Sequence, residues 1–175
     1  MMAPKGSAFL YTRKECQELI DPLVVSWGWD PDWAYATGIR YQDNLQWYGT
    51  IDPSAYLSVP AAFDFLDEHN WEQIRSNCHE MLIETLNRIQ GLTGLAFEYP
   101  PDERFMHQMG IAPLPRLKDH RKLQKTLWDA HRIEVPIIEW NERHFVRVSI
   151  QGYNSQQDIE TLLMALQELL PEHTQ

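Results

Sequence analysis

The stretch EVPIIEWNERHFVRVSI, residues 134–150, decides the fold that this sequence predicts. Its two halves, 134–140 and 144–150, are rich in β-branched and aromatic residues, which favour strands. Asn141-Glu142-Arg143 stands between them and is typical of a tight connection. The stretch therefore predicts a β-hairpin.

The segments around the hairpin indicate what covers it. A strand is expected at 106–112, before two prolines, and a helix at 118–130, where the apolar residues have helical spacing. After the hairpin, Ser155 and Asp158 predict the capping-box start of a last helix. Strand, helix, hairpin and helix in this order predict a small α+β layer, with helices over an antiparallel sheet.

The first half of the chain has a different character. Short apolar runs at 8–11 and 23–27 predict two buried strands. From Gly28 to Thr50 there is no helical or alternating pattern, and the stretch from Trp27 to Tyr48 is rich in tryptophan and tyrosine. So long an irregular segment is either functional or interfacial, or a loop held by its own aromatic side chains, and the sequence favours neither.

Two helices are expected between these halves. The pair Asp52-Pro53 predicts a helix start, because a carboxylate cap precedes a proline at the first helical position. This helix should reach about residue 68 and kink at Pro60. A longer one is expected from Asn70 to Gly91, with an apolar face formed by Ile74, Cys78, Leu82, Leu86 and Ile89.

Composition excludes several classes of protein. With 43% hydrophobic and 23% charged residues, the 175-residue chain is typical of a globular protein. Its net charge of −10 argues against a nucleic-acid partner, and no apolar run approaches the ~20 residues that span a bilayer, so no membrane partner is expected. No secretory signal is visible, and we expect a cytoplasmic protein with Cys16 and Cys78 reduced, although one disulfide stays open.

Arg147 and the Gly49-Thr50 pair are the candidate binding residues. Val146 and Val148 share one face of their strand, whereas Arg147 projects from the other and could offer a planar fork to a carboxylate. The alternative is that this face is simply exposed to solvent. Gly49 and Thr50 precede a helix start and could hold a phosphate, but such a pair is commonly only a turn and a cap.

The sequence contains no motif of a metal site or of a hydrolase active site. None of the seven histidines has metal-ligand spacing to another histidine or a cysteine, and no nucleophile elbow or glycine-rich phosphate loop is present. The sequence therefore predicts no metal site and no complete hydrolase centre.

Five segments, taken in order, resemble the C-terminal part of the class V aminotransferase family, which uses pyridoxal 5'-phosphate, and in particular its isopenicillin-N-epimerase-like branch. They are APKGSAFL (3–10), PLVVSWG (22–28), WYGTIDPSAYL (47–57), RIEVP (132–136) and VRVSIQGYN (146–154). The resemblance covers nearly the whole chain. It implies the type I fold of these enzymes, with the last strands and the aromatic loop of the large domain at 1–52, linking helices at 53–91 and the small α+β domain at 92–175.

The same resemblance assigns roles to the candidate residues. It implies that Arg147 binds the α-carboxylate of an amino-acid substrate. It also implies that Gly49 and Thr50 reach across a dimer to the cofactor phosphate of the other subunit. Ile51 departs from the branch, which commonly has arginine there, and so changes the polar surroundings of the cofactor.

The family's Schiff-base lysine lies just upstream of the segment that contains Lys5, so the resemblance implies that this sequence begins after it. We therefore expect no catalytic residue in this chain, no pyridoxal phosphate bound by it alone, and no activity without an N-terminal partner chain. The alternative is a non-catalytic remnant or interaction module that retains the small-domain fold. Because strands 8–11 and 23–27 would lack neighbours, we also expect a homo-oligomer or dependence on a partner.

Overall fold

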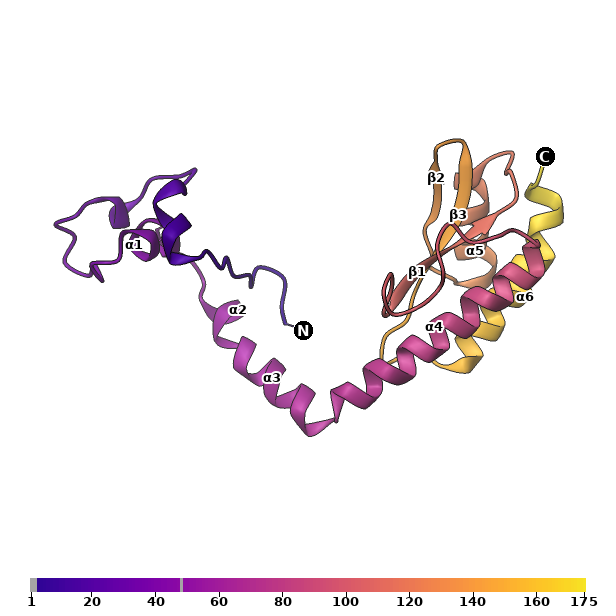
Figure 1. Ribbon diagram of the computed structural model, residues 1–175, viewed down its shortest axis with the longest axis horizontal. Coiled ribbons are helices and arrows are strands. Elements are labelled where there is room, and N and C mark those ends of the chain that lie inside the picture. Colours follow the sequence, from indigo (N-terminus) through magenta and orange to yellow (C-terminus); the bar gives the residue numbers. More distant parts are fainter. Residues whose placement is uncertain (1–2, 48) are drawn as a thin grey trace. The chain divides into compact units, whose positions relative to one another are not determined.

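The computed structural model describes residues 3–47 and 49–175, so Tyr48 of the predicted aromatic loop lies outside the described residues. The chain divides into two compact units, an N-terminal unit, Met1–His69, and a C-terminal unit, Asn70–Gln175 (Figure 1). The division falls between the two helices that were expected to link the halves. The three-part division at residues 52 and 91 stays a prediction. No helix in the described part is long and apolar enough to cross a bilayer.

A three-stranded antiparallel sheet organises the C-terminal unit. Strand β3 (Arg143–Ser149) lies in the centre, between β1 (Met109–Leu114) and β2 (Ile137–Trp140). The predicted hairpin is confirmed, but its turn has two residues, Asn141 and Glu142, both with positive φ. Positive φ at both central residues is the conformation that matches the twist of a hairpin, so Arg143 belongs to β3 and not to the turn.

Three helices pack with this sheet and enclose the core: α4 (Trp71–Thr93), α5 (His120–His131) and α6 (Gln156–His173). The predicted apolar face of α4 is confirmed, since Leu82, Leu86 and Ile89 are fully buried. Helix α4 lies so close to β1 that a Cβ added to Gly110 would be 2.7 Å from the Leu86 side chain. The α+β layer predicted from the element order is therefore present.

Two element boundaries differ from the prediction for physical reasons. Strand β1 continues through Pro113, opposite Phe145. Because β1 is an edge strand, the missing backbone donor of a proline is tolerated there. Helix α4 passes Gly91 and ends at Thr93, because Gly94, with φ 69°, provides the left-handed C-cap.

The described residues of the N-terminal unit form five short helical segments joined by irregular chain. They are η1 (Lys14–Leu19), η2 (Trp27–Trp29), α1 (Arg40–Gln46), α2 (Ser54–Leu57) and α3 (Val59–Glu68). The helix expected from Asp52 to residue 68 is thus two helices. They separate at Ser58, and Pro60 occupies the first turn of α3, where its lack of a donor is tolerated.

The strands predicted at 8–11 and 23–27 are wrong, because no strand occurs among the described residues of this unit. Phe9 is 83% exposed and Leu23 is fully exposed, so the two apolar runs are not buried either. A strand needs a neighbour for its backbone donors and acceptors, and the described part of this unit supplies none.

The aromatic stretch contains a helix, α1, that its sequence pattern did not predict. Buried Asp43 of α1 accepts hydrogen bonds from the backbone N–H and hydroxyl of Thr37, at 2.9 and 2.7 Å, and from the N–H of Gly38. These donors, those of Thr37 first, hold the pKa of Asp43 below its usual value. Gly28 lies against the Asp43 carbonyl, where a side chain would not fit.

Aromatic contacts also hold this stretch together. The Trp33 ring lies 5.7 Å from that of Tyr35 and 5.6 Å from that of Trp47. Trp27 and Tyr35 nevertheless remain largely exposed. The stretch is thus held by its own side chains on the inside, and its exposed aromatic surface leaves an interfacial role open.

Candidate functional site

Arg147 is fixed by both of its neighbours in the sheet. It lies in the central strand opposite Ile111 of β1, and its backbone N–H donates to the carbonyl of Pro136 at 3.0 Å. Val146 and Val148 on either side of it are buried in the helix-covered core, so Arg147 projects from the other face, as the alternation predicted. The arginine is half-buried, so this position is not a plain solvent-exposed face.

The guanidinium of Arg147 has an unmet hydrogen-bonding group. Its Nε is buried and has no hydrogen-bond partner among the described residues. Leaving a buried donor unpaired costs about 1–3 kcal/mol, and more for a charged group. Such a donor on a permanently charged, planar group suits a carboxylate, which can accept two parallel hydrogen bonds.

A hollow of about 480 Å³ lies beside Arg147. Its walls come from the end of α5 and the segment after it, from β3 and the loop that follows, and from the first turns of α6. The polar groups at its surface are the donors of His131, Arg132, Ser149, Tyr153, Asn154 and Thr161, together with the carboxylates of Glu134 and Asp158. The hollow therefore combines several donors and two carboxylates with the unpaired arginine, so it offers partners for both charges of a small zwitterionic ligand.

The loop after β3 is held in one conformation by its own amides. The backbone N–H of Gln151 donates to Asn154 Oδ1 at 2.9 Å, and the backbone N–H of Asn154 donates to the Gln151 carbonyl at 2.8 Å. Gln108 braces the loop from the other side through hydrogen bonds to Ile150 O and Gln151 Oε1. Tyr153, 82% exposed, is thereby held at the hollow on a defined backbone.

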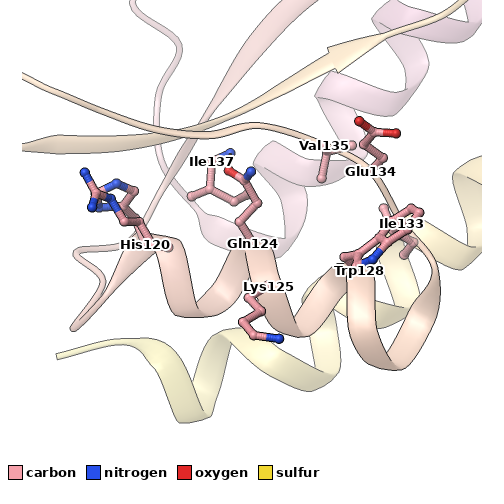
Figure 2. Close-up of a pocket in the computed structure, with 9 residues that line it drawn as sticks. His120, Gln124, Lys125, Trp128, Ile133, Glu134, Val135 and Ile137 are labelled. Atoms are coloured by element: carbon pink, nitrogen blue, oxygen red, sulfur yellow. Dashed lines mark hydrogen bonds between the residues drawn. The ribbon is translucent and has the colours of Figure 1, made fainter.

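The segment Arg132–Pro136 lines this hollow and also a second one. Ile133, Glu134 and Val135 face both the Arg147 hollow and an open groove of about 600 Å³ along α5. Figure 2 shows that groove, with His120 at one end and Trp128 and Ile133 at the other. The RIEVP motif thus separates two hollows of the C-terminal unit.

Gly49 and Thr50 belong to the other unit. Gly49 has φ 113°, a conformation that disfavours any side chain, and Thr50 is exposed. Asp52 Oδ1 accepts from the N–H of Ser54 at 2.9 Å, but the N-cap of α2 is Pro53, so the helix starts one residue later than the predicted cap at Asp52 implied. Because α2 has only four residues, its dipole gives no argument for a phosphate, and the assignment of Gly49 and Thr50 depends on the resemblance.

The Arg147 hollow does not fit a covalently held pyridoxal phosphate. No lysine is among the described residues that line it. Its arginine and polar loop suit the carboxylate of a substrate rather than the aldehyde of the cofactor.

Tertiary structure also assembles a group that the sequence did not indicate. His120, Glu139 and His144 come from α5, β2 and β3, and their ligand atoms lie within 4.8 Å of one another. No spacing rule could have found His120, whereas the pairing of Glu139 with His144 follows from the hairpin register.

Comparison with known proteins shows which family and which relatives this chain resembles. A family model for class-V aminotransferases matches residues 1–162. Isopenicillin N epimerase of Amycolatopsis lactamdurans is 31% identical over 176 residues, covering 97% of this chain and 44% of that protein. A putative L-cysteine desulfhydrase 1 of Oryza sativa subsp. japonica is 29% identical over 197 residues, covering 97% and 38%. The chain thus spans less than half the length of these relatives.

The fold has a counterpart among solved structures. The crystal structure of 8-amino-7-oxononanoate synthase from Francisella tularensis matches with a TM-score of 0.54, over 77% of this chain and 37% of that chain. Sequence identity is 15%, so this likeness concerns the fold alone.

Proposed function

Because this chain belongs to the class V aminotransferase family, we propose that it supplies the substrate-carboxylate site of a pyridoxal-phosphate enzyme that acts on amino acids. The observation that carries the proposal is the buried, unpaired Nε of Arg147 beside a polar hollow. The family match and the similarity to an epimerase and a desulfhydrase support a reaction on an amino acid.

Arg147 would orient the substrate through its carboxylate. A central strand that is hydrogen-bonded on both sides holds the arginine backbone, which fixes the point from which the guanidinium reaches the ligand. Two parallel hydrogen bonds from the guanidinium fix the plane of the carboxylate and hence the direction of the amino group. Pyridoxal phosphate, when bound to such an enzyme, acts as the electron sink for chemistry at the adjacent carbon.

Gly49 and Thr50 are proposed as a contact with the cofactor phosphate of a second subunit. Thr50 is exposed, and its hydroxyl and the neighbouring backbone donors can bind an anion. Ile51 is 44% exposed and carries no charge, so this contact would be weaker than in relatives with arginine at that position.

The 175-residue chain by itself is proposed to be inactive, because the Arg147 hollow has no lysine to hold the cofactor among its described residues. The test is to incubate the purified chain with pyridoxal phosphate, reduce it with borohydride and measure its mass. We expect no stoichiometric adduct. One cofactor per chain fixed at a single lysine, together with turnover of an amino acid, would contradict the proposal.

The carboxylate site can be tested directly by NMR titration of the whole chain with L-alanine and with acetate. We expect saturable shifts of the Arg147 side-chain signal and an affinity at least tenfold lower in Arg147→Gln. Arg143→Gln is the matched control, because Arg143 lies on the same face of β3 but pairs with Glu98 outside the hollow. Unchanged spectra of the unsubstituted chain at tens of millimolar ligand would contradict the proposal.

A second candidate function is that of an interaction module, and the surface of the N-terminal unit favours it. Phe9, Leu23, Val24 and Trp27 are each more than half exposed. Exposed apolar surface of this kind favours self-association or binding to a partner chain. Sedimentation should show association that Leu23→Ser and Trp27→Ser weaken, and a monomer at high concentration would contradict this function.

A further inference from the structure

His120, Glu139 and His144 form a cluster on three different elements of the C-terminal unit. His120 is the first residue of α5, Glu139 lies in β2, and His144 lies directly opposite Glu139 in β3. His120 Nδ1 is 3.2 Å from Glu139 Oε2, and the two imidazole rings have their centroids 5.9 Å apart. One potential ligand atom from each residue lies within 4.8 Å of the others.

We propose that these three residues bind a divalent transition-metal ion, with Zn²⁺ as the best match. Two imidazoles and one carboxylate are a ligand set that zinc takes in proteins, with a fourth position left for water or a ligand. Ligand atoms about 2.0–2.2 Å from a tetrahedral zinc ion lie about 3.3 Å from one another. The contact between His120 and Glu139 already has this length, so mainly the His144 ring has to approach.

The scaffold around the cluster is rigid, which favours a defined geometry. Asp119 caps α5 by accepting the N–H groups of Arg121 and Lys122, and this fixes the helix start that carries His120. Glu139 and His144 are held in register by the hairpin. Ligands on hydrogen-bonded elements lose little freedom when they bind a metal.

His144 presents one ring nitrogen to a metal. It is only 7% exposed and lies directly opposite Glu139 in the hairpin. Its Nδ1 accepts the N–H of Leu117 at 3.3 Å, so Nε2 is the atom left for a metal. Binding there moves the imidazole proton to Nδ1 and breaks the Leu117 bond, whose length already marks it as weak.

The cluster also adjoins a cavity. His120 lines one end of the groove along α5 in Figure 2, beside Gln124 and Ile137. Gln124 Oε1 accepts the N–H of Ile137 at 3.0 Å and so ties the helix to the edge strand next to the cluster. A ligand entering the groove would thus reach the neighbourhood of the open metal position.

The test is a zinc titration of the whole chain, stripped with chelator, in competition with a chromophoric chelator. We expect one zinc ion per chain at micromolar or tighter affinity, and at least tenfold weaker binding in His120→Gln and in Glu139→Gln. Both side chains are partly exposed, so these variants should fold even if His144→Gln does not. His131→Gln, at the other end of α5, is the matched control and should bind like the unsubstituted chain.

A second readout separates this cluster from adventitious binding. Zinc should shift the NMR signal of the Leu117 amide, because that amide loses its acceptor, and cobalt should give the absorption of a tetrahedral site. No zinc binding, or equal affinity in His120→Gln, Glu139→Gln and His131→Gln, would overturn the proposal. The outcome does not depend on the amino-acid function proposed for Arg147.

Discussion

The two units of this chain use similar apolar sequence to different effect. In the C-terminal unit the apolar residues of α4, β3 and α6 meet in one core, in which Leu86, Val146 and Leu166 are fully buried. In the N-terminal unit equally apolar runs, such as Leu23-Val24-Val25, stay exposed. The difference lies in the neighbours that each unit provides, since both runs would suit a strand by composition.

Among the described residues, the C-terminal unit closes its own core and the N-terminal unit does not. Strand β3 has hydrogen-bonded partners on both sides, and helices cover one face of its sheet. The N-terminal unit is held instead by a few local anchors, chiefly Asp43 and the contacts of Trp33. We therefore expect the two units to respond differently to the same kind of substitution.

The largest expected effect is in the core of the C-terminal unit. Leu86→Ala should lower the free energy of unfolding by about 2–5 kcal/mol, because Leu86 is fully buried and its loss leaves a cavity. Leu23→Ala, the same change at a fully exposed leucine, should change it by less than about 0.5 kcal/mol at protein concentrations too low for association. Urea unfolding followed by circular dichroism measures both.

The Leu23→Ala variant also tests whether this exposed run is covered by another chain. A cost above about 1 kcal/mol that grows with protein concentration would show that a second chain covers the segment. A similar cost that is independent of concentration would show that Leu23 is buried within the chain, contrary to its full exposure in the N-terminal unit.

The sequence predicted the C-terminal unit well because its signals are local. Helical spacing, the Ser155–Asp158 capping box and the hairpin each specify an element from neighbouring residues, and all three are present. The strands at 8–11 and 23–27 failed because an apolar run does not show whether a partner strand exists. Helix α1 was missed because Asp43, and not an apolar stripe, anchors it.

The candidate sites show the same limit. Alternation in β3 placed Arg147 on the face opposite Val146 and Val148, but only the structure showed its unpaired Nε. The metal cluster needed both the two-residue turn, which pairs Glu139 with His144, and the packing of α5. A turn that included Arg143 would have shifted this pairing, so one residue of register decides whether the cluster exists.

Smaller changes in the free energy of unfolding are expected from substituting one glycine with alanine in each unit. Gly28→Ala should destabilise the N-terminal unit by about 1–3 kcal/mol, because its Cβ would lie 1.7 Å from the Asp43 carbonyl oxygen and the backbone has to move. Gly91→Ala meets no neighbour within 4 Å and lies inside α4, so it should stabilise the C-terminal unit by about 0.5–1 kcal/mol.

Hydrogen exchange resolved by peptide can assign each effect to its unit. Gly28→Ala should speed exchange in α1 and leave the sheet unchanged, whereas Gly91→Ala should slow exchange in α4. Faster exchange in both units of Gly28→Ala would show that the two units unfold together, contrary to the expectation that each unit unfolds separately.

A further small effect is expected at Arg132, a residue other than glycine in the left-handed conformation that ends α5. Arg132 ends α5 with φ 57°, and its N–H donates to Trp128 O at 3.0 Å while Ile133 N–H donates to Leu127 O. The Arg132 bond, to the carbonyl four residues back, is that of the αL cap, in which glycine is preferred because a side chain is strained in the left-handed region. Arg132→Gly should therefore stabilise the unit by about 1 kcal/mol, measured by thermal unfolding.

Arg132 also lines the Arg147 hollow, so the same variant, tested for L-alanine binding, shows whether its charge contributes there. Higher stability with weaker binding would mean that the strained backbone of Arg132 is retained because its side chain helps to bind the ligand. Higher stability with unchanged binding would leave Arg147 as the main partner of the carboxylate.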